Sequence, residues 1–367
     1  MMMNFAKFGN ELYSGKRSFD IVGNRRRWFA IGIGLIILSG LLVGIRGINP
    51  GIEFRGGSEF TVSGISDPDP QLAHDALAEV NSEQVARVST VGSSAIRVQT
   101  EELTDAETDE LADLLAEAYG VPTSDVTSSF VGPSWGADVT SKAVQGLVIF
   151  LVLVTLVMAL YFRRWSMAIA ALIALLHDLI VTIGLYSGVG FEVTPASVIG
   201  FLTILGYSLY DTVVVFDKVR ENTEGVLDQT RYTYAEAANL AVNQTLVRSI
   251  NTSVVGLLPV ASILFVGAFL LGAGTLRDIA LALFIGMLLS TLSSIFIATP
   301  MEVVLRQRDP KIAAHTAKVL ELRERRVAEA EDDGLTADEV LAEARAGGLV
   351  AGRHLGQGAQ PRRKTKR

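Results

Sequence analysis

The chain has 367 residues, a formal net charge of −7 and a mean hydropathy of +0.38; 49% of its residues are hydrophobic and 19% are charged. This composition is too apolar for an ordinary water-soluble protein, so a lipid bilayer is the expected solvent. The sequence contains no cysteine, which excludes disulfides, thiolate metal sites and cysteine nucleophiles and leaves the redox compartment undetermined. The negative charge argues against a nucleic-acid ligand, although in a membrane protein the side on which each charge lies matters more than the sum.

The first apolar run extends from Trp28 to Ile45 and ends at Arg46. A helix needs about 20 residues, at a rise of about 1.5 Å each, to cross the hydrocarbon core of a bilayer. The run therefore predicts a first membrane span at 28–45, after a cytoplasmic segment at 1–27. A cleaved signal peptide is the alternative, but no small-x-small cleavage pattern follows the run.

Five more apolar runs predict further spans, at 143–162, 167–185, 196–216, 249–270 and 279–298. Basic residues beside short loops mark the cytoplasmic side of a membrane. On one predicted side, the short loops at 186–195 and 271–278 carry one basic residue, Arg277. The segments on the other side carry eleven: Lys7, Lys16, Arg17, Arg25, Arg26, Arg27, Arg163, Arg164, Lys218, Arg220 and Arg231. Both termini and the loop at 217–248 are therefore expected in the cytoplasm of a multi-pass protein.

Residues 46–141 contain seventeen acidic and four basic residues, which is typical of a water-soluble domain. Hydrophobic periodicity predicts strand, helix, strand, strand, helix and strand, at 58–62, 70–80, 85–91, 95–99, 105–119 and 126–131. This order is that of a ferredoxin-like split βαβ unit. The predicted fold is an α-helical polytopic membrane protein of six transmembrane helices, with an extracytoplasmic α+β domain between helices 1 and 2.

The predicted domain shows no constellation of catalytic residues. His74 lies beside Asp75 on the first predicted helix, where adjacent side chains do not face each other, so a solvated pair is expected. The sequence has neither a spaced Asp-x-Asp-x-Asp-Gly calcium loop nor a P-loop. We expect no metal, no cofactor and no enzymatic activity, and we expect this domain to bind partners by surface shape.

Several ionisable residues fall inside or beside the predicted spans. Each costs about 2.5–3.5 kcal/mol at the bilayer centre on the insertion scale, so it needs a partner, a proton or a water-filled cavity. The third span carries His177 and Asp178, and Asp178 lies about 16 Å into it if the segment is helical. The fourth span carries Asp211, with Asp217 near its cytoplasmic end, and Arg248 opens the fifth.

Asp211 and Arg248 are expected at a similar depth, because Asp211 lies about 10 Å from the boundary at which the fifth span begins. A carboxylate titrates low beside a guanidinium and high when it is desolvated without a partner. Exchange of partners would therefore load and release a proton, which makes the pair a candidate proton relay. The alternative is a static ion pair that fixes helix packing, with His177, Asp178 and Asn251 as polar groups of the bundle interior.

Small residues in the spans predict close contacts between helices. They are Gly200, Gly206, Gly256 and Gly286. Pro259 interrupts the fifth span. The sequence is compatible both with a functional hinge and with a tolerated kink at this proline.

Several segments resemble signatures of the SecD/SecF family. The segment from Gly51 to Gly57 is similar to the family's Gly-x-Asp-Phe-x-Gly-Gly motif, with glutamate in place of the usual aspartate, and the segments at 206–222, 248–253 and 293–298 resemble its fourth, fifth and sixth spans. In this order the motifs cover the chain from about residue 19 to residue 300. The matching motif residues include Gly51, Glu53, Phe54, Gly56, Gly57, Gly206, Tyr207 and Ser208.

The resemblance implies an accessory subunit of the Sec protein-export machinery in the plasma membrane, within the resistance-nodulation-division superfamily. Such a subunit pairs with SecD, associates with the SecYEG channel, and uses the proton-motive force to draw preproteins outward after SecA has driven them in. The family's proton-transporting aspartate and arginine fall on Asp211 and Arg248. Membrane lipid is the expected surrounding, with no specific nucleic acid. The alternatives are half of a proton-driven exporter of small molecules or lipids, and a static translocon scaffold.

The cytoplasmic tail at 302–367 is expected to be partly helical. A charged helix is predicted at 311–331, and Thr336 and Glu339 form the pattern of a capping box that opens a short second one. The basic end at 362–367 is expected to be disordered. Both a solvated tail and attraction to anionic lipid or ribosomal RNA are compatible with its charge.

Overall fold

The structure is a computed structural model, which describes residues 5–81, 84, 86–91, 94–268 and 274–332. The chain forms two compact units. The first unit comprises residues 1–29, 211–251 and 294–367, and the second comprises residues 30–210 and 252–293. Because the boundaries fall inside long helices, several helices contribute to both units.

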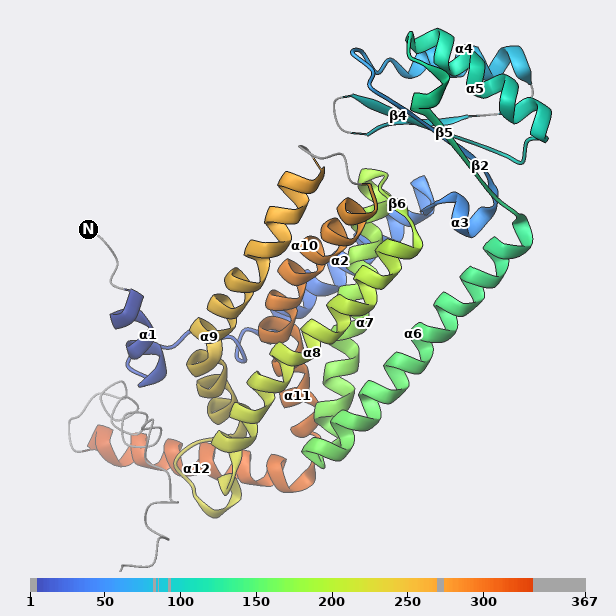
Figure 1. Cartoon of the computed structure of the whole chain (residues 1–367). Helices are drawn as coiled ribbons and strands as arrows, with labels where there is room; N and C mark the ends of the chain where they lie inside the picture. The colour runs from blue at the N-terminus through green and yellow to red at the C-terminus, as the bar shows by residue number, and fades with distance from the viewer. Residues whose placement is uncertain (1–4, 82–83, 85, 92–93, 269–273, 333–367) are drawn as a thin grey trace, which may run out of the picture. The chain divides into compact units, whose positions relative to one another are not determined.

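Among the described residues, six helices are long and apolar enough to cross a membrane, one for each predicted span. They are α2 (Arg25–Arg46), α6 (Pro133–Phe162), α7 (Trp165–Val189), α8 (Pro195–Thr223), α9 (Tyr234–Ser262) and α10 (Gly274–Ser293) (Figure 1). Two π-helical segments, Ile263–Ala268 and Ser294–Ala298, continue α9 and α10, and α11 (Thr299–Arg306) follows the second. The predicted spans lie within these helical segments, apart from residues 269 and 270, which are outside the described residues.

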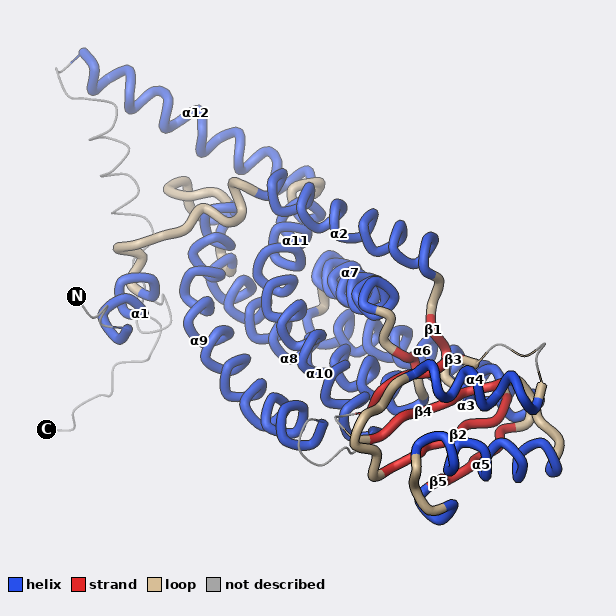
Figure 2. Tube along the Cα trace, turned by 90° about the horizontal axis from the view of Figure 1, so that it is seen from above, coloured by secondary structure: helices blue, strands red, loops and turns tan. Residues whose placement is uncertain are grey.

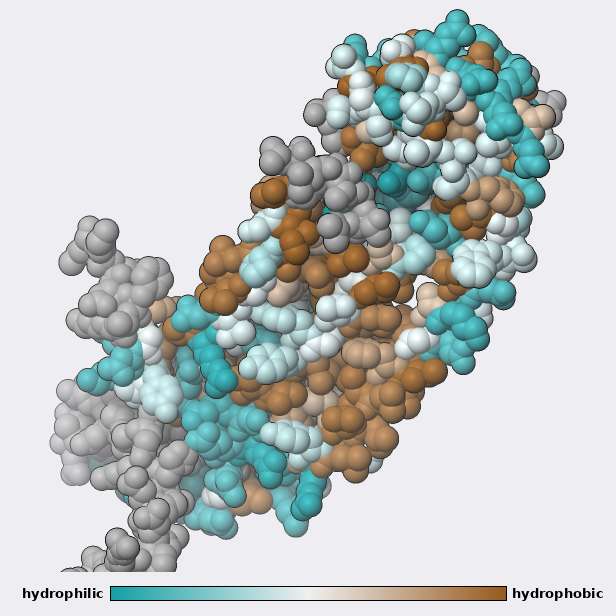
Figure 3. Space-filling model, in the orientation of Figure 1, coloured by the Kyte–Doolittle hydropathy of each residue, from teal (hydrophilic) through white to brown (hydrophobic). Residues whose placement is uncertain are grey.

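Many large apolar side chains on the helices α2 and α6 are exposed. On α6, Val148, Val152 and Leu156 are each about half exposed, at 54%, 61% and 49%. Apolar side chains, drawn in brown, gather over the helices in Figure 3. Contiguous exposed apolar surface of this kind is typical of helices that face lipid or another membrane protein.

Close helix contacts occur at three of the four predicted glycines. A Cβ atom added to Gly200 or Gly286 would lie 2.7 Å or 2.2 Å from a side-chain carbon of the facing helix, and one added to Gly256 would lie 2.9 Å from such a carbon. At Gly206 a Cβ atom would meet open space, so the expectation is wrong there. The helix α9 continues through Pro259 to Ser262, because helices in membranes tolerate proline.

The α/β domain lies between α2 and α6 and has the predicted order of strands and helices. Its elements are β1 (Asn49–Pro50), α3 (Ile52–Arg55), β2 (Gly57–Ser63), α4 (Pro70–Val80), β3 (Arg87–Val91), β4 (Ala95–Thr100), α5 (Asp105–Tyr119) and β5 (Val126–Val131). The short elements β1 and α3 were not predicted. Residues 85, 92 and 93, which belong to the predicted hairpin, lie outside the described residues.

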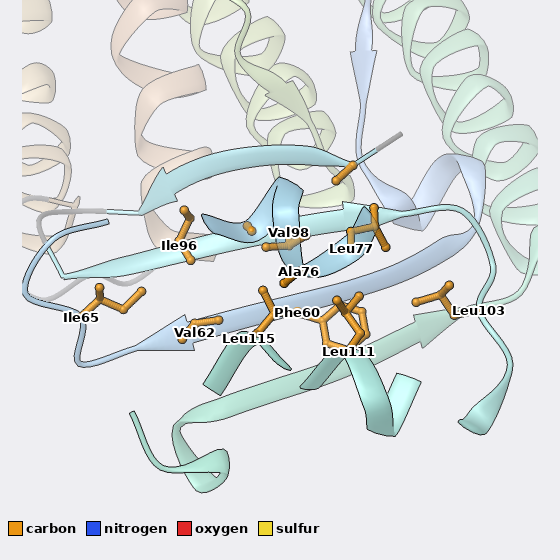
Figure 4. Close-up of a cluster of buried hydrophobic side chains, with 12 residues drawn as sticks. Phe60, Val62, Ile65, Ala76, Leu77, Ile96, Val98, Leu103, Leu111 and Leu115 are labelled. Carbon is orange, nitrogen blue, oxygen red and sulfur yellow. The ribbon is translucent and has the colours of Figure 1, made fainter. Parts of the chain in front are cut away.

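The strands β3, β4, β2 and β5 form an antiparallel sheet in this order, so β4 and β2 are its central strands. The helices α4 and α5 lie on one face of the sheet (Figure 2). Side chains alternate between the two faces of a strand, and the apolar set packs against the helices (Figure 4); it includes Phe60, Val62, Leu77, Ile96, Val98, Leu111 and Leu115. The alternate residues Glu59, Arg97 and Gln99 consequently lie on the opposite face.

Capping residues explain why the two helices of the domain begin where the sequence predicts. Asp69 accepts a hydrogen bond from the backbone N–H of Gln71, and a proline occupies the first helical position of α4. Thr104 and Glu107 form a reciprocal capping box at the start of α5. Gly120 ends α5 in the left-handed conformation that glycine adopts without strain.

The first unit joins the N-terminal segment to α9. Asn243 Oδ1 accepts a hydrogen bond from Phe19 N at 2.7 Å, and Asn243 Nδ2 donates to Phe19 O at 2.9 Å. The segment at 217–248, predicted as a loop, is mainly helical, because α8 continues to Thr223 and α9 begins at Tyr234.

The helices α1 (Phe5–Tyr13) and α12 (Pro310–Asp332) also belong to the first unit. The charged helix predicted at 311–331 is therefore confirmed as α12. The predicted capping box at 336–339 and the basic end at 362–367 lie outside the described residues.

Candidate functional site

Among the described residues of the second unit, Asp178 is the most enclosed carboxylate, with 1% of its surface exposed. It lies on α7 and receives hydrogen bonds from two neighbouring helices. Ser208 Oγ of α8 and Ser293 Oγ of α10 both donate to Asp178 Oδ2, at 2.9 Å and 2.7 Å. Three helices therefore meet at a single carboxylate oxygen.

The sequence around Asp178 allows this meeting. Buried alanines on α7, among them Ala171 and Ala174, are each 1% exposed and let neighbouring backbones approach closely. Thr182 directs its own hydroxyl to the Asp178 carbonyl at 2.7 Å, so it does not compete for the carboxylate. Helix packing thus delivers the two serine hydroxyls to the acid.

His177 is buried beside Asp178, with its Nδ1 atom 3.2 Å from Asp178 Oδ1. Its Nε2 atom has no hydrogen-bond partner among the described residues. Within the described residues, no lysine or arginine forms an ion pair with Asp178. The carboxyl group therefore has hydroxyl donors and one imidazole but no permanent counter-charge, so protonation would change its hydrogen bonding directly.

Asp211 is a buried carboxylate of the first unit, with 3% of its surface exposed. It lies on α8 and accepts a hydrogen bond at 2.6 Å from Ser294 Oγ. Ser294 begins the π-helical segment that follows α10, and such insertions are frequent at functional sites because they redirect side chains.

The predicted ion pair between Asp211 and Arg248 is not formed in this structure. Arg248 is exposed, and no salt bridge between the two occurs within the described part of the chain. The reason is its position on α9. The buried stripe of that helix contains Thr245 and Ser249 at i and i+4, and Arg248, one residue before Ser249, points about 100° away from Ser249. Asn251 and Asp217 are exposed as well.

Ser293 and Ser294 are the site residues that the sequence did not single out. They appeared only within a segment matched to the family's sixth span. Two adjacent hydroxyls in a long apolar run are an available signal, because consecutive helical residues point about 100° apart and can serve different neighbours. The acid that each one would meet depends on tertiary packing.

The glycine motif has a clear structural role. Gly56 and Gly57 have φ values of +83° and +126° as the chain turns from α3 into β2. A Cβ atom on Gly57 would lie 2.3 Å from the Thr100 carbonyl oxygen, and one on Gly56 would lie 2.9 Å from the Pro133 Cα atom. Other residues are strained in this conformation and lack the space, so both glycines are required for the turn.

Glu53 of the same motif lies on α3 and is half-buried. Burial raises the pKa of its carboxyl group, and the nearby carboxylates Glu192 and Glu59 raise it further. Gly51 lies close to the same groups, because a Cβ atom there would be 2.4 Å from Glu53 Oε2 and 3.1 Å from Glu192 Oε1. The motif thus also places the Glu53 carboxyl group where the chain enters the first strand of the sheet, β2.

These features define a class of protein: a multi-pass helical membrane protein with buried carboxylates held by hydroxyls of neighbouring helices. Two family descriptions match the chain. "Protein export membrane protein SecD/SecF, C-terminal" matches residues 111–308, and "SecD/SecF GG Motif" matches residues 41–63. The chain belongs to the SecD/SecF family of protein export membrane proteins.

Individual relatives agree with this family. The chain is 44% identical over 342 residues to the protein translocase subunit SecF of Streptomyces coelicolor, covering 92% of this chain and 90% of the relative. It is 45% identical over 325 residues to the SecF subunit of Mycobacterium tuberculosis, covering 86% and 73%. These names indicate an accessory role in Sec protein export, and they confirm the resemblance found in the motifs.

A solved structure has the same helical architecture. The crystal structure of SecDF from Thermus thermophilus, described as a translocon-associated membrane protein, superimposes with a TM-score of 0.70 at 31% identity. The match covers 79% of this chain and 39% of the SecDF chain, so this chain spans about two fifths of that protein.

Proposed function

We propose that this chain is a non-enzymatic subunit that pairs with a SecD partner and uses the proton-motive force to assist preprotein translocation through the SecYEG channel after SecA. In this proposal it lies in the plasma membrane with both termini in the cytoplasm. The α/β domain is a ferredoxin-like domain on the extracytoplasmic side. It contacts the translocating preprotein, and no cofactor or nucleic acid takes part.

The observation that carries the proposal is the environment of Asp211. The carboxyl group is buried, receives a short hydrogen bond from Ser294, and forms no ion pair with a described lysine or arginine. Such a group accepts a proton without losing a counter-ion, and ionisable residues inside membranes mark proton pathways. Asp178, held by two hydroxyls and flanked by His177, supplies a second group of the same kind.

Arg248 has a defined place in this scheme. It is exposed on α9 while Asp211 is bonded to a serine hydroxyl. Exchange of Ser294 for Arg248 as the partner of Asp211 would favour the ionised carboxylate and release the proton. Each proton that moves through about 100 mV supplies about 2.3 kcal/mol, which is enough to shift a two-state equilibrium about 50-fold.

The pairing with a SecD partner is supported by the solved SecDF structure, in which a region similar to this chain forms 39% of one longer chain. The uncovered apolar faces of α2 and α6 provide surface for such a partner or for lipid.

The substitution Asp211→Asn tests the proposal, because it keeps the shape of the side chain and removes its titration. Preprotein secretion into membrane vesicles is measured with and without an imposed proton gradient. We expect loss of the gradient-dependent part, whereas Glu224→Gln, which changes an exposed carboxylate just beyond α8, leaves it unchanged. Unaltered gradient dependence in Asp211→Asn would leave the static scaffold as the better description.

A further inference from the structure

The connection between α7 and α8, residues 190–194, is a short segment held by hydrogen bonds rather than a free loop, and we call it the strap. It contains β6 (Glu192–Val193), which pairs in parallel with β1. Gly51 N donates to Val193 O at 2.9 Å, and Ser187 Oγ donates to Gly47 O at 2.6 Å. These bonds tie the end of α7 and the strap to the chain that leaves α2.

The strap is equally fixed at its junction with α8. Thr194 N donates to Ser197 Oγ at 2.7 Å, Ser197 N donates to Thr194 Oγ1 at 3.2 Å, and Thr194 Oγ1 donates to Asp278 Oδ2 at 3.3 Å. On the α7 side, the ring of Phe191 packs against Tyr186 with centroids 5.5 Å apart. Because the strap is only five residues long and bonded at both ends, any displacement of α7 and α8 must carry Glu192 with it.

Glu192 contacts the polar face of the sheet. Arg97 Nη1 lies 3.3 Å from Glu192 Oε2, and Gln99 Nε2 donates to Glu192 Oε1 in a short hydrogen bond. Glu59 completes the group, since it accepts from Gln99 at 2.9 Å and lies 3.5 Å from the Arg97 Nε atom. The side chains of Glu192 and Arg97 are 14% and 15% exposed, and such enclosed charges interact more strongly than surface pairs.

The position of these partners within the sheet determines where a force on Glu192 would act. Arg97 and Gln99 belong to β4 and Glu59 belongs to β2, which are the two central strands. Each central strand is bonded along its length to two neighbours. A force applied through Glu192 therefore acts on the middle of the sheet and moves the α/β domain as a body, whereas a force on an edge strand would bend the edge.

The space beside this contact is polar and unfilled by side chains. A cavity of about 230 Å³ is lined by Glu53, Glu59, Arg97, Thr194 and Asp278, together with Pro195 and Ala196. At about 30 Å³ per molecule it has room for several waters. On this side the domain therefore meets the strap through directional polar bonds beside open volume, so the side chains can turn without repacking an apolar core.

We propose that Glu192 is a positioning residue that passes displacement of α7 and α8 to the α/β domain through Arg97 and Gln99. The proposal rests on the proposed function, because α7 carries Asp178 and α8 carries Ser208 and Asp211. A change in the protonation of these acids would rearrange the bonds among the helices. The strap converts that rearrangement into movement of the domain.

Distance measurements in native membrane vesicles test the proposal. The chain has no cysteine of its own, so pairs of introduced cysteines can be spin-labelled specifically. One pair, at Glu110 on α5 and Ile169 on α7, reports the domain against the helices. A second pair, at Ile180 on α7 and Leu288 on α10, reports the helices alone. All four positions are exposed.

We expect both distances to change when a proton gradient is imposed. In Glu192→Ala the helix pair should still respond and the domain pair should not, while Glu117→Ala, at an exposed position of α5, should behave as the unsubstituted chain. If the domain pair also responds in Glu192→Ala, the proposal is wrong and the proposed function stands. If the helix pair fails to respond in the unsubstituted chain, proton coupling fails and the proposal falls with it.

A reversible chemical cross-link between positions 97 and 192 distinguishes loss of transmission through this contact from general damage to the structure. In the unlabelled double variant Arg97→Cys with Glu192→Cys, we expect gradient-dependent secretion to be lost. A short bis-methanethiosulfonate reagent should then restore it in the same sample, and reduction should remove it again. Two results would contradict a role for this contact in transmission. In the first, gradient-dependent secretion does not fall in the double variant; in the second, it falls but the cross-link does not restore it.

Discussion

Removal of the Ser293 hydroxyl tests the three-helix junction at Asp178. The Ser293 Oγ atom donates to Asp178 Oδ2 at 2.7 Å, and both residues are almost fully buried. A hydrogen bond to a charged group contributes about 1.5–3 kcal/mol, and loss of the donor also leaves the acceptor less satisfied. Ser293→Ala should therefore lower the free energy of unfolding by about 1.5–3 kcal/mol.

Ser290 provides a matched control. It lies three residues earlier on α10, is 0% exposed, and its Oγ atom has no hydrogen-bond partner among the described residues. Ser290→Ala removes the same atom from a similar environment without breaking a side-chain bond. Its effect should stay within about 0.5 kcal/mol.

The assay is denaturant unfolding of the purified protein in mild detergent, completed as a double-mutant cycle with Asp178→Asn. If Ser293 acts through the carboxylate, the cost of Ser293→Ala should fall markedly in the Asp178→Asn background, because a neutral amide oxygen is a weaker acceptor. Equal costs for Ser293→Ala and Ser290→Ala, or a coupling energy of zero with Asp178→Asn, would refute the reasoning.

Three further predictions concern other parts of the chain. Gly57→Ala places a Cβ atom 2.3 Å from a carbonyl oxygen at φ +126°, so the level of folded protein in membranes should fall sharply, whereas Gly132→Ala, with open space at its Cβ position, should be tolerated. Asn243→Ala removes both bonds to Phe19; the N-terminal segment should become sensitive to limited proteolysis at an expected cost of about 1–3 kcal/mol, and unchanged protection would contradict this. Because burial raises the pKa of Glu53, the folded state favours the neutral form of this carboxyl group, and this stabilisation is lost as the pH rises through the folded pKa. The melting temperature of Glu53→Gln, measured relative to that of the unsubstituted chain, should therefore increase with pH. A difference in melting temperature that stays constant with pH would contradict the raised pKa.

The sequence was sufficient for the elements whose signals are local. Apolar runs long enough to cross a bilayer located the six helices, and hydrophobic periodicity at 70–80 and 105–119 located α4 and α5. The alternation of side chains along β2 and β4 separated the apolar face of the sheet from the polar one. These features depend on residues close together in the chain.

Contacts between distant segments were beyond sequence reasoning. The strands β1 and β6 are two residues each and have no periodicity to detect, yet they join Asn49 to Glu192. Depth along the membrane placed Asp211 and Arg248 together, but depth gives no information about which face of α9 carries Arg248, and that face is exposed. Ser293 and Ser294 acquire their importance only from the acids that helix packing brings to them.

Carboxyl protonation is the event on which proton coupling depends, and infrared difference spectroscopy observes it directly. Spectra of the protein in vesicles are recorded as a proton gradient is imposed and then dissipated. Proton coupling predicts a C=O stretching band of a protonated carboxyl group that follows the gradient, disappears in Asp211→Asn and persists in Glu224→Gln. A spectrum without such a band, or a band that is unchanged in Asp211→Asn, would contradict the role of Asp211 as the proton carrier.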